Sequence, residues 1–141
     1  MDRMRRSTCV ALLAAASGLA AAQEGELAAT PALAAAEIWL TLLDEGRYGQ
    51  AWDRVVPMMQ EKIPRTQWET GLATTRQPLG LALRRKLRQA NLTHIVPGAP
   101  DGDYFVLQYD TVFDGRPLTT EIVTAMKDRD GVWRVSGYEL R

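Results

Sequence analysis

Residues 104–115 have the sequence YFVLQYDTVFDG and predict a β-strand that ends in a tight turn. Apolar and polar residues alternate between Tyr104 and Phe113, which is the pattern of a strand with one buried face. The apolar positions on that face are Phe105, Leu107, Tyr109 and Phe113. Asp114-Gly115 is a strong hairpin signal, so we expect residues 118–127 to form the next strand, antiparallel to the first.

Two further strands are expected on either side of this hairpin. Leu81, Leu83 and Leu87 alternate with polar or charged residues, which indicates a strand over residues 81–96 with a buried leucine face. A bulge near residues 89–90 would turn Leu92 back toward that face. Asp130-Gly131 predicts another turn before a last strand over residues 133–140, with Gly137 as a bulge.

The part of the chain before the strands is expected to be helical. Apolar residues recur at helical spacing over residues 32–44, 48–56 and 67–76. Pro57 should end or kink the second helix, and Thr66 with Glu69 matches a capping box for the third. Helices followed by hairpin-linked strands predict an α+β fold. We therefore expect three helices packed on a curved, four-stranded antiparallel sheet that forms an open cone.

The N-terminus has the features of a secretory signal peptide over residues 1–22. Three arginines precede an apolar stretch over residues 8–19, which is too short to span a bilayer. Ala20-Ala21-Ala22 supplies small residues for cleavage before Gln23. Residues 23–31 are expected to be a short leader, and residues 32–141 a single domain. An N-terminal membrane anchor would need a longer apolar run, and Cys9 lies too early for a lipoprotein signal.

Export would change the charge and the cysteine content. The chain has 17 basic and 17 acidic residues, and cleavage would remove three arginines, one aspartate and Cys9, leaving a net charge of −2. Such a domain has no thiol for a disulfide and lacks the basic field of a nucleic-acid-binding protein. We expect it in the periplasm or outside the cell, with no transmembrane segment after cleavage and no nucleic-acid partner.

Several segments together resemble one known family. They are Trp39-Leu40, Asp44-x-Gly46-x-Tyr48, Arg76-x-Pro78-Leu79-Gly80, Arg84-Arg85-Lys86-Leu87, Pro97-Gly98-x-Pro100-Asp101-Gly102 and Trp133-Arg134-Val135. Their combination is similar to the bacterial domain-of-unknown-function family numbered 4019, over nearly all of the mature chain. The resemblance implies an exported protein with the arrangement of the nuclear-transport-factor-2-like or cystatin-like group. It implies no catalytic residues, and fold alone does not choose a function.

The candidate ligand-binding residues are those that strand and helix phase places toward the hollow of the cone. They are Trp68, Arg85, Tyr109, Glu121 and Tyr138. The tryptophans at positions 39, 52, 68 and 133 either line a cavity or fill the core, and core filling is the commoner arrangement. Arg85 lies on the apolar side of its strand, so it needs a partner such as Glu121, Asp110 or Glu69.

Other reactive residues do not form a recognisable constellation. His94 is the only histidine, with Asp101, Asp103, Asp110 and Glu121 as candidate partners, and we expect it at the surface. The carboxylates at positions 101, 103, 128 and 130 lack calcium-loop spacing, and Ser136 has no nucleophile elbow around it. We therefore expect no catalytic residues, no metal and no cofactor. Arg84, Lys86 and Arg88 share one strand face, either as a patch for acidic partners or as a solvated edge.

These observations favour a non-enzymatic binding module for an envelope protein or a small ligand. A small acid/base enzyme of the isomerase or dehydratase type is the first alternative, with Tyr109, Glu121 or His94 as proton carriers. A homodimer that packs sheet against sheet in a structural role is the second.

Overall fold

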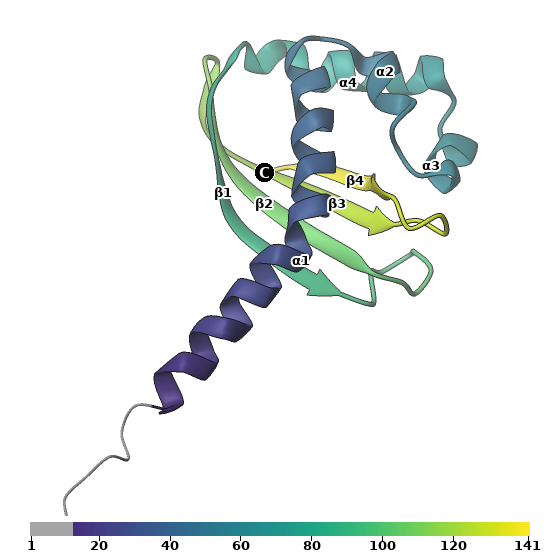
Figure 1. Cartoon of the computed structure of the whole chain (residues 1–141). Coiled ribbons are helices and arrows are strands. Elements are labelled where there is room, and N and C mark those ends of the chain that lie inside the picture. The colour runs from purple at the N-terminus through teal and green to yellow at the C-terminus, as the bar shows by residue number, and fades with distance from the viewer. Residues whose placement is uncertain (1–12) are drawn as a thin grey trace, which may run out of the picture. The chain divides into compact units, whose positions relative to one another are not determined.

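The computed structural model describes residues 13–141 of the chain, and the side chains from residue 28 onward. It divides between Thr30 and Pro31 into two compact units, and residues 31–141 form the unit that contains the sheet. The elements follow one another along the chain as shown in Figure 1. They are the helices α1 (Leu13–Asp44), α2 (Tyr48–Trp52), α3 (Pro57–Lys62) and α4 (Arg65–Arg76), the short 3₁₀ helix η1 (Gln77–Leu79), and the strands β1 (Ala82–Thr93), β2 (Tyr104–Phe113), β3 (Arg116–Lys127) and β4 (Trp133–Leu140).

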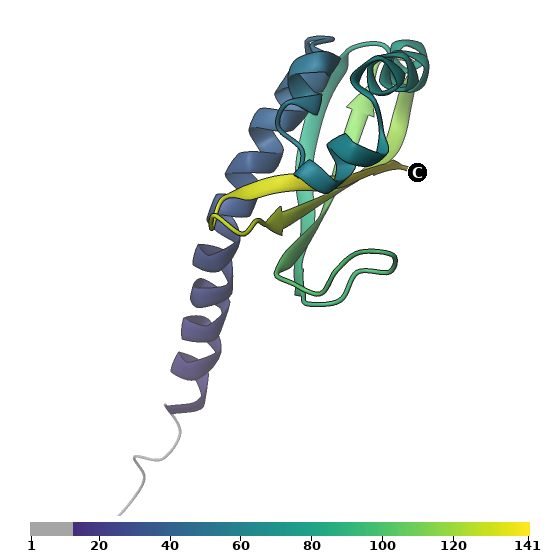
Figure 2. The same ribbon diagram turned by 90° about the vertical axis from the view of Figure 1, so that its right-hand side faces the viewer.

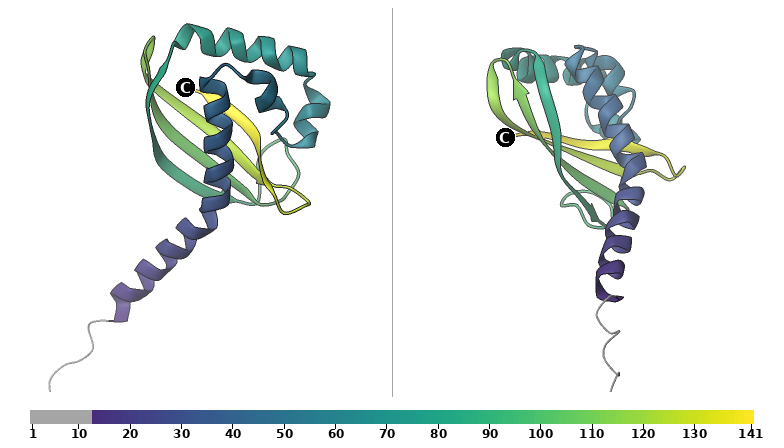
Figure 3. Two further views of the ribbon diagram at one scale, coloured as in Figure 1. Left: turned by 45° about the horizontal axis from the view of Figure 1, so that its top comes forward. Right: turned by 60° about the vertical axis from the view of Figure 1, so that its left-hand side comes forward.

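The four strands form one sheet in the order β1-β2-β3-β4, and each neighbouring pair is antiparallel. The sheet is curved, and the helices lie on its concave side (Figures 1 and 2). Figure 3 shows α4 passing over one end of the sheet and α1 crossing its concave face. The α+β class and the curved antiparallel sheet are confirmed, and β2 and β4 have the predicted bounds.

Aromatic side chains fill the space between α1 and the sheet. Trp39 is fully buried, and its Nε1 donates a hydrogen bond to the carbonyl oxygen of Ala51 at 3.1 Å. Its ring makes edge-on contacts with Trp68 and Tyr138, with ring centroids 6.1 Å and 5.1 Å away. Core filling is therefore confirmed for Trp39, Trp68 is buried but also borders a pocket, and Trp52 and Trp133 are only half-buried.

The helix boundaries differ from the predicted ones at three places. The first helix begins well before residue 32, and α2 ends at Trp52 instead of residue 56. Pro57 does not end a helix but begins α3, where its missing N–H costs nothing. The capping box is wrong, because the amide of Trp68 bonds to the carbonyl of Pro64 and the helix starts at Arg65. Thr66 thus lies inside the helix, too late to cap it.

The predicted buried leucine face of β1 is also wrong. Leu81, Leu83 and Leu92 are 70%, 57% and 54% exposed, and no residue of β1 is buried. The expected bulge is present between Leu87 and Gln89, and Leu87 and Leu92 lie on the concave side as predicted, whereas a second register shift between Ala82 and Arg84 places Ala82 opposite the buried Phe113. The leucines of β1 are exposed because β1 is an edge strand with a single neighbour.

Candidate functional site

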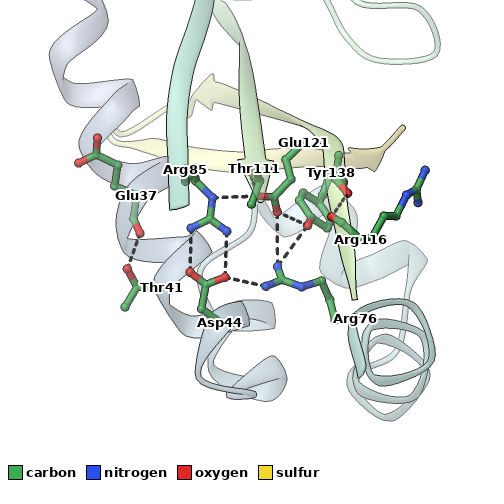
Figure 4. A network of polar contacts seen from close by, with 10 residues as sticks. Glu37, Thr41, Asp44, Arg76, Arg85, Thr111, Arg116, Glu121 and Tyr138 are labelled. Atoms are coloured by element: carbon green, nitrogen blue, oxygen red, sulfur yellow. Dashed lines mark hydrogen bonds and ion pairs between the residues drawn. The ribbon is translucent and has the colours of Figure 1, made fainter. Parts of the chain in front are cut away.

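A network of charged and hydroxyl side chains is buried between the helices and the concave face of the sheet (Figure 4). Its centre is Glu121 on β3, which is fully buried. One carboxylate oxygen accepts hydrogen bonds from Arg85 Nε at 2.7 Å and Thr111 Oγ1 at 2.5 Å. The other oxygen accepts a short bond from the Tyr138 hydroxyl and a long one from Arg76 at 3.4 Å.

Asp44 joins the two arginines of this network on the helix side. Its carboxylate accepts a bond of 2.6 Å from Arg76 and bonds of 2.7 Å and 2.9 Å from Arg85. The two arginines and two carboxylates therefore balance in charge. Arg76 is buried as deeply as a core residue, with 3% of its side chain exposed, and such burial is tolerated only where the charge is paired.

The sequence explains how these side chains meet. Arg85 faces Thr111 across the β1–β2 pair, on the same sheet face as Glu121. Arg76 is the last residue of α4, and Asp44 is the last residue of α1. Both helices thus end at a charged residue whose side chain belongs to the network.

Glu121 was predicted as a partner of Arg85, and that pair is confirmed. The other two candidates pair elsewhere: Asp110 with Arg88 at 3.5 Å, and Glu69 with Arg65 at 3.1 Å. Asp44 and Arg76 were not predicted as members of the site. One signal was available for Asp44, because a carboxylate at a helix C-terminus opposes the helix dipole and calls for a cationic partner.

The pKa values in the network follow from burial and pairing. Burial alone would raise the pKa of Asp44, but hydrogen bonds from Arg85 and Arg76 and their positive charges outweigh it and lower that pKa. Burial tends to lower the pKa of Arg85, but bonds to Asp44 and the charge of Glu121 raise it. Burial and the nearby Glu121 raise the pKa of Tyr138. Asp44 and Arg85 thus keep their charges at neutral pH, and Tyr138 keeps its proton.

Tyr109 lies on the same face but outside this hydrogen-bonded set. Burial raises its pKa to about 12, with a contribution from the carboxylate of Glu37. Its hydroxyl is buried and has no hydrogen-bond partner within the described part of the chain. It is therefore a protonated core phenol at neutral pH.

An apolar pocket of about 420 Å³ lies next to the network, between α3, α4 and β4. Its lining residues are Met59, Ile63, Gln67, Trp68, Gly71, Leu72, Thr75, Tyr138 and Leu140. Of the five predicted ligand-binding residues, Trp68 and Tyr138 line this pocket. The other three, Arg85, Tyr109 and Glu121, do not.

The remaining candidates lie at the surface. His94 is exposed, and its Nδ1 lies 2.9 Å from an oxygen of Asp103, one of the partners considered for it. Asp128 and Asp130 both accept bonds from Arg134 beside the last turn. Among the side chains that the structure describes, from residue 28 onward, no group of three His, Cys, Asp or Glu residues is placed to hold a metal ion. No helix in that range is long and apolar enough to cross a membrane.

The fold and the network define a class: an α+β domain whose helices cover one face of a four-stranded antiparallel sheet, clamped by buried arginine–carboxylate pairs. A sequence profile described as "protein of unknown function (DUF4019)" matches residues 35–138. The chain therefore belongs to the DUF4019 family, as the resemblance indicated. Comparisons with curated proteins and with solved structures gave no match.

Proposed function

We propose that this protein is an exported, non-enzymatic binding domain that takes a small, mainly apolar ligand in the pocket between α3, α4 and β4. The observation that carries the proposal is the pocket itself. Its volume of about 420 Å³ falls within the range of small-molecule sites. Apolar side chains from three elements form most of its wall, with Gln67, Thr75 and Tyr138 as the polar contacts that could orient a ligand.

The two aromatic walls of the pocket are held in place before any ligand arrives. Trp68 Nε1 donates a hydrogen bond of 3.0 Å to the carbonyl of Tyr48. Tyr138 is fixed at its hydroxyl by Glu121 and at its ring by Trp39. A wall that does not have to be ordered on binding costs less affinity, so this rigidity supports a binding role.

The same network speaks against the acid/base alternative. Glu121 is fully buried and already accepts bonds from two arginines and two hydroxyl groups. A general base must reach the proton of its substrate, either directly or through one water molecule. Burial raises the pKa of Tyr109 to about 12, so Tyr109 keeps its proton at neutral pH. His94 is exposed on a different part of the surface.

Two neighbouring threonines of α4 allow a matched test. Both are exposed and bond to the carbonyl four residues earlier, Thr74 at 2.9 Å and Thr75 at 2.8 Å, but only Thr75 lines the pocket. The probe is a neutral naphthylamine dye whose fluorescence rises in an apolar site. We expect Thr75→Phe to weaken dye binding about tenfold or more, since it fills the site, and Thr74→Phe to leave it unchanged. Equal dye binding by both variants would refute the pocket.

Mass spectrometry of the protein recovered under native conditions distinguishes the kinds of partner. A co-purifying small apolar molecule that is lost in Thr75→Phe supports the proposal. A co-purifying envelope protein would point to the other kind of partner considered for a binding module, and a dimer by light scattering that persists in Thr75→Phe would point to the structural role.

A further inference from the structure

The two edges of the sheet are not equivalent. The edge strand β4 is partly covered, because the connection between α2 and α3 runs beside it: Val55 bridges to Val135, and the amide of Val56 donates a bond of 3.0 Å to the Val135 carbonyl. At the other edge, β1 pairs only with β2. Within the described part of the chain, no residue bridges to its outer edge. A free edge of 12 residues is long for a β-strand.

The side chains of β1 are sorted by face. Across the β1–β2 pair, Leu87 lies opposite Tyr109 and Leu92 opposite Phe105, so both leucines are on the concave side. Arg84 lies opposite Val112 and Lys86 opposite Asp110, so both cations are on the convex side. The free edge of β1 thus presents leucines on one side of the sheet and cations on the other.

The cations on the convex side of β1 make few ion pairs within the described part of the chain. Arg84 and Lys86 have no ion pair among the described residues, and Arg88 has only a contact of 3.5 Å with Asp110, both side chains being more than half exposed. The inward-pointing Arg85 is different, because Asp44 and Glu121 neutralise it. Acidic groups on a partner could therefore approach the convex side of β1 without displacing an internal pair.

The exposed leucines distinguish this edge from a strand edge that is only protected against pairing with other chains. Charges alone are enough to keep edge strands from pairing with other chains. Exposed leucines work against that protection, yet Leu83 and Leu92 are more than half exposed and Leu87 is 36% exposed. Such a pattern is typical of strands that accept an additional strand, whose alternate side chains continue both faces of the sheet.

We propose that the free edge of β1 docks an extended, acidic segment of a partner protein by β-strand addition. The segment alternates acidic with apolar residues. Its carboxylates meet Arg84, Lys86 and Arg88 on the convex side, and its apolar side chains cover Leu87 and Leu92 on the concave side. A second copy of β1 fits poorly, because it would bring its own cations to this edge. A bilayer surface fits poorly as well, because it meets one face and the leucines and cations are on opposite faces.

The test uses a blocked peptide of about ten residues that alternates glutamate and valine, long enough to pair with most of a strand. With isotope-labelled protein, we expect peptide binding to shift the amide resonances of β1 and to slow their hydrogen exchange. Lys86→Glu should weaken binding about fivefold or more, whereas Lys127→Glu, an exposed lysine of β3, should not. A peptide with lysine in place of glutamate should not bind.

Two further arms make the proposal falsifiable. The same acidic peptide with all of its backbone nitrogens methylated keeps its charge but has no N–H groups to donate to β1 in either direction, and it should not bind. Equal binding of the methylated peptide would show attraction by charge alone and overturn strand addition. Failure of the unmodified peptide to bind at low salt, or stronger binding to vesicles containing anionic phosphatidylglycerol, would likewise overturn it.

Discussion

Glu121 is fully buried in the core, and two arginines and two hydroxyl groups surround its carboxyl group. We expect Glu121→Gln to lower the free energy of unfolding by about 3–5 kcal/mol, because Arg76 and Arg85 would then share a single carboxylate in a buried site. Glutamine keeps the shape of the side chain, so the loss would report charge rather than packing. Urea denaturation measures it.

The control for this substitution is Asp110→Asn. Asp110 pairs with Arg88 at 3.5 Å, and both side chains are more than half exposed. Exposed pairs of this kind contribute about 1 kcal/mol or less. A loss of similar size in the two variants would mean that the buried network does not stabilise the fold through its charges.

Asp44 should make stability depend on pH in acid. Its pKa lies below the ordinary value of 3.8 in the folded chain, because the bonds and charges of Arg85 and Arg76 outweigh its burial. A lowered pKa contributes stability above the unfolded value, and that contribution is lost as pH falls through the folded value. Wild type should therefore exceed Asp44→Asn in stability at neutral pH, and the difference should shrink below about pH 4.

Urea titrations of both proteins at several pH values test this expectation. Asp130 also has a lowered pKa, of about 2, through its hydrogen bonds with Arg134 and the amide of Val132. Its contribution is common to both proteins and cancels in the difference. A difference that stays constant down to about pH 3 would contradict the role given to Asp44.

Sequence reasoning at the residue scale succeeded where periodicity fixes a face. Arg85 was assigned to the concave side with Glu121 as a partner, because strand phase places a side chain on one of two faces only. It missed Asp44 and Arg76, since their contacts with each other and with the sheet depend on how two helix ends are placed in space. Such placement is set by packing between elements that lie 32 residues apart in the chain.

At the scale of elements, the β2–β3 turn and η1 lie close together. The amide of Gly115 donates a bond of 2.8 Å to the Leu79 carbonyl, and a Cβ atom at Gly115 would lie 2.8 Å from the Pro78 carbonyl oxygen. We expect Gly115→Ala to destabilise the fold by about 1–3 kcal/mol, because backbone atoms on both sides would have to move. Thermal unfolding followed by circular dichroism measures the change.

Gly71 of α4 gives the opposite expectation for the same substitution. A Cβ atom there meets nothing within 4 Å, and the position is inside a helix. Gly71→Ala should raise the free energy of unfolding by about 0.5–1 kcal/mol. If both alanine variants changed the free energy of unfolding in the same direction, the close approach of the turn to η1 would not explain the effect of Gly115→Ala.

Elements defined by alternation and turn residues could be predicted closely. The bounds of β2 and β4 are as expected, since Asp114-Gly115 and Asp130-Gly131 mark the turns beside them. Burial of β1 could not be predicted, because an alternating strand shows the same pattern in the middle of a sheet and at its edge. The start of α4 was missed because Pro64, whose backbone is extended, is the N-cap residue, so the helix begins before the capping pattern of Thr66 and Glu69.

At the scale of the whole molecule, the folded unit of residues 31–141 lies entirely after the predicted cleavage site. Export with removal of residues 1–22 would therefore leave this unit whole. It would also remove Cys9, so that charge pairs and packing alone would hold the domain in an oxidising compartment. In that case the ion pairs of Asp44 and Glu121 with Arg76 and Arg85 would link segments that lie far apart in the chain, as disulfides do in many exported domains.

The predicted cleavage can be tested at the three alanines before Gln23. A signal peptidase selects small residues at the first and third positions before the cut, here Ala22 and Ala20, and tolerates larger ones between them. In a bacterial host, we expect the protein recovered outside the cytoplasm to begin at Gln23 and to lack a reactive thiol. Ala20→Phe with Ala22→Phe should leave the chain uncut and thiol-reactive, whereas Ala21→Phe should be processed normally. N-terminal sequencing and thiol labelling read both properties, and a wild-type chain that stays full-length in the membrane fraction would instead make residues 1–22 an anchor.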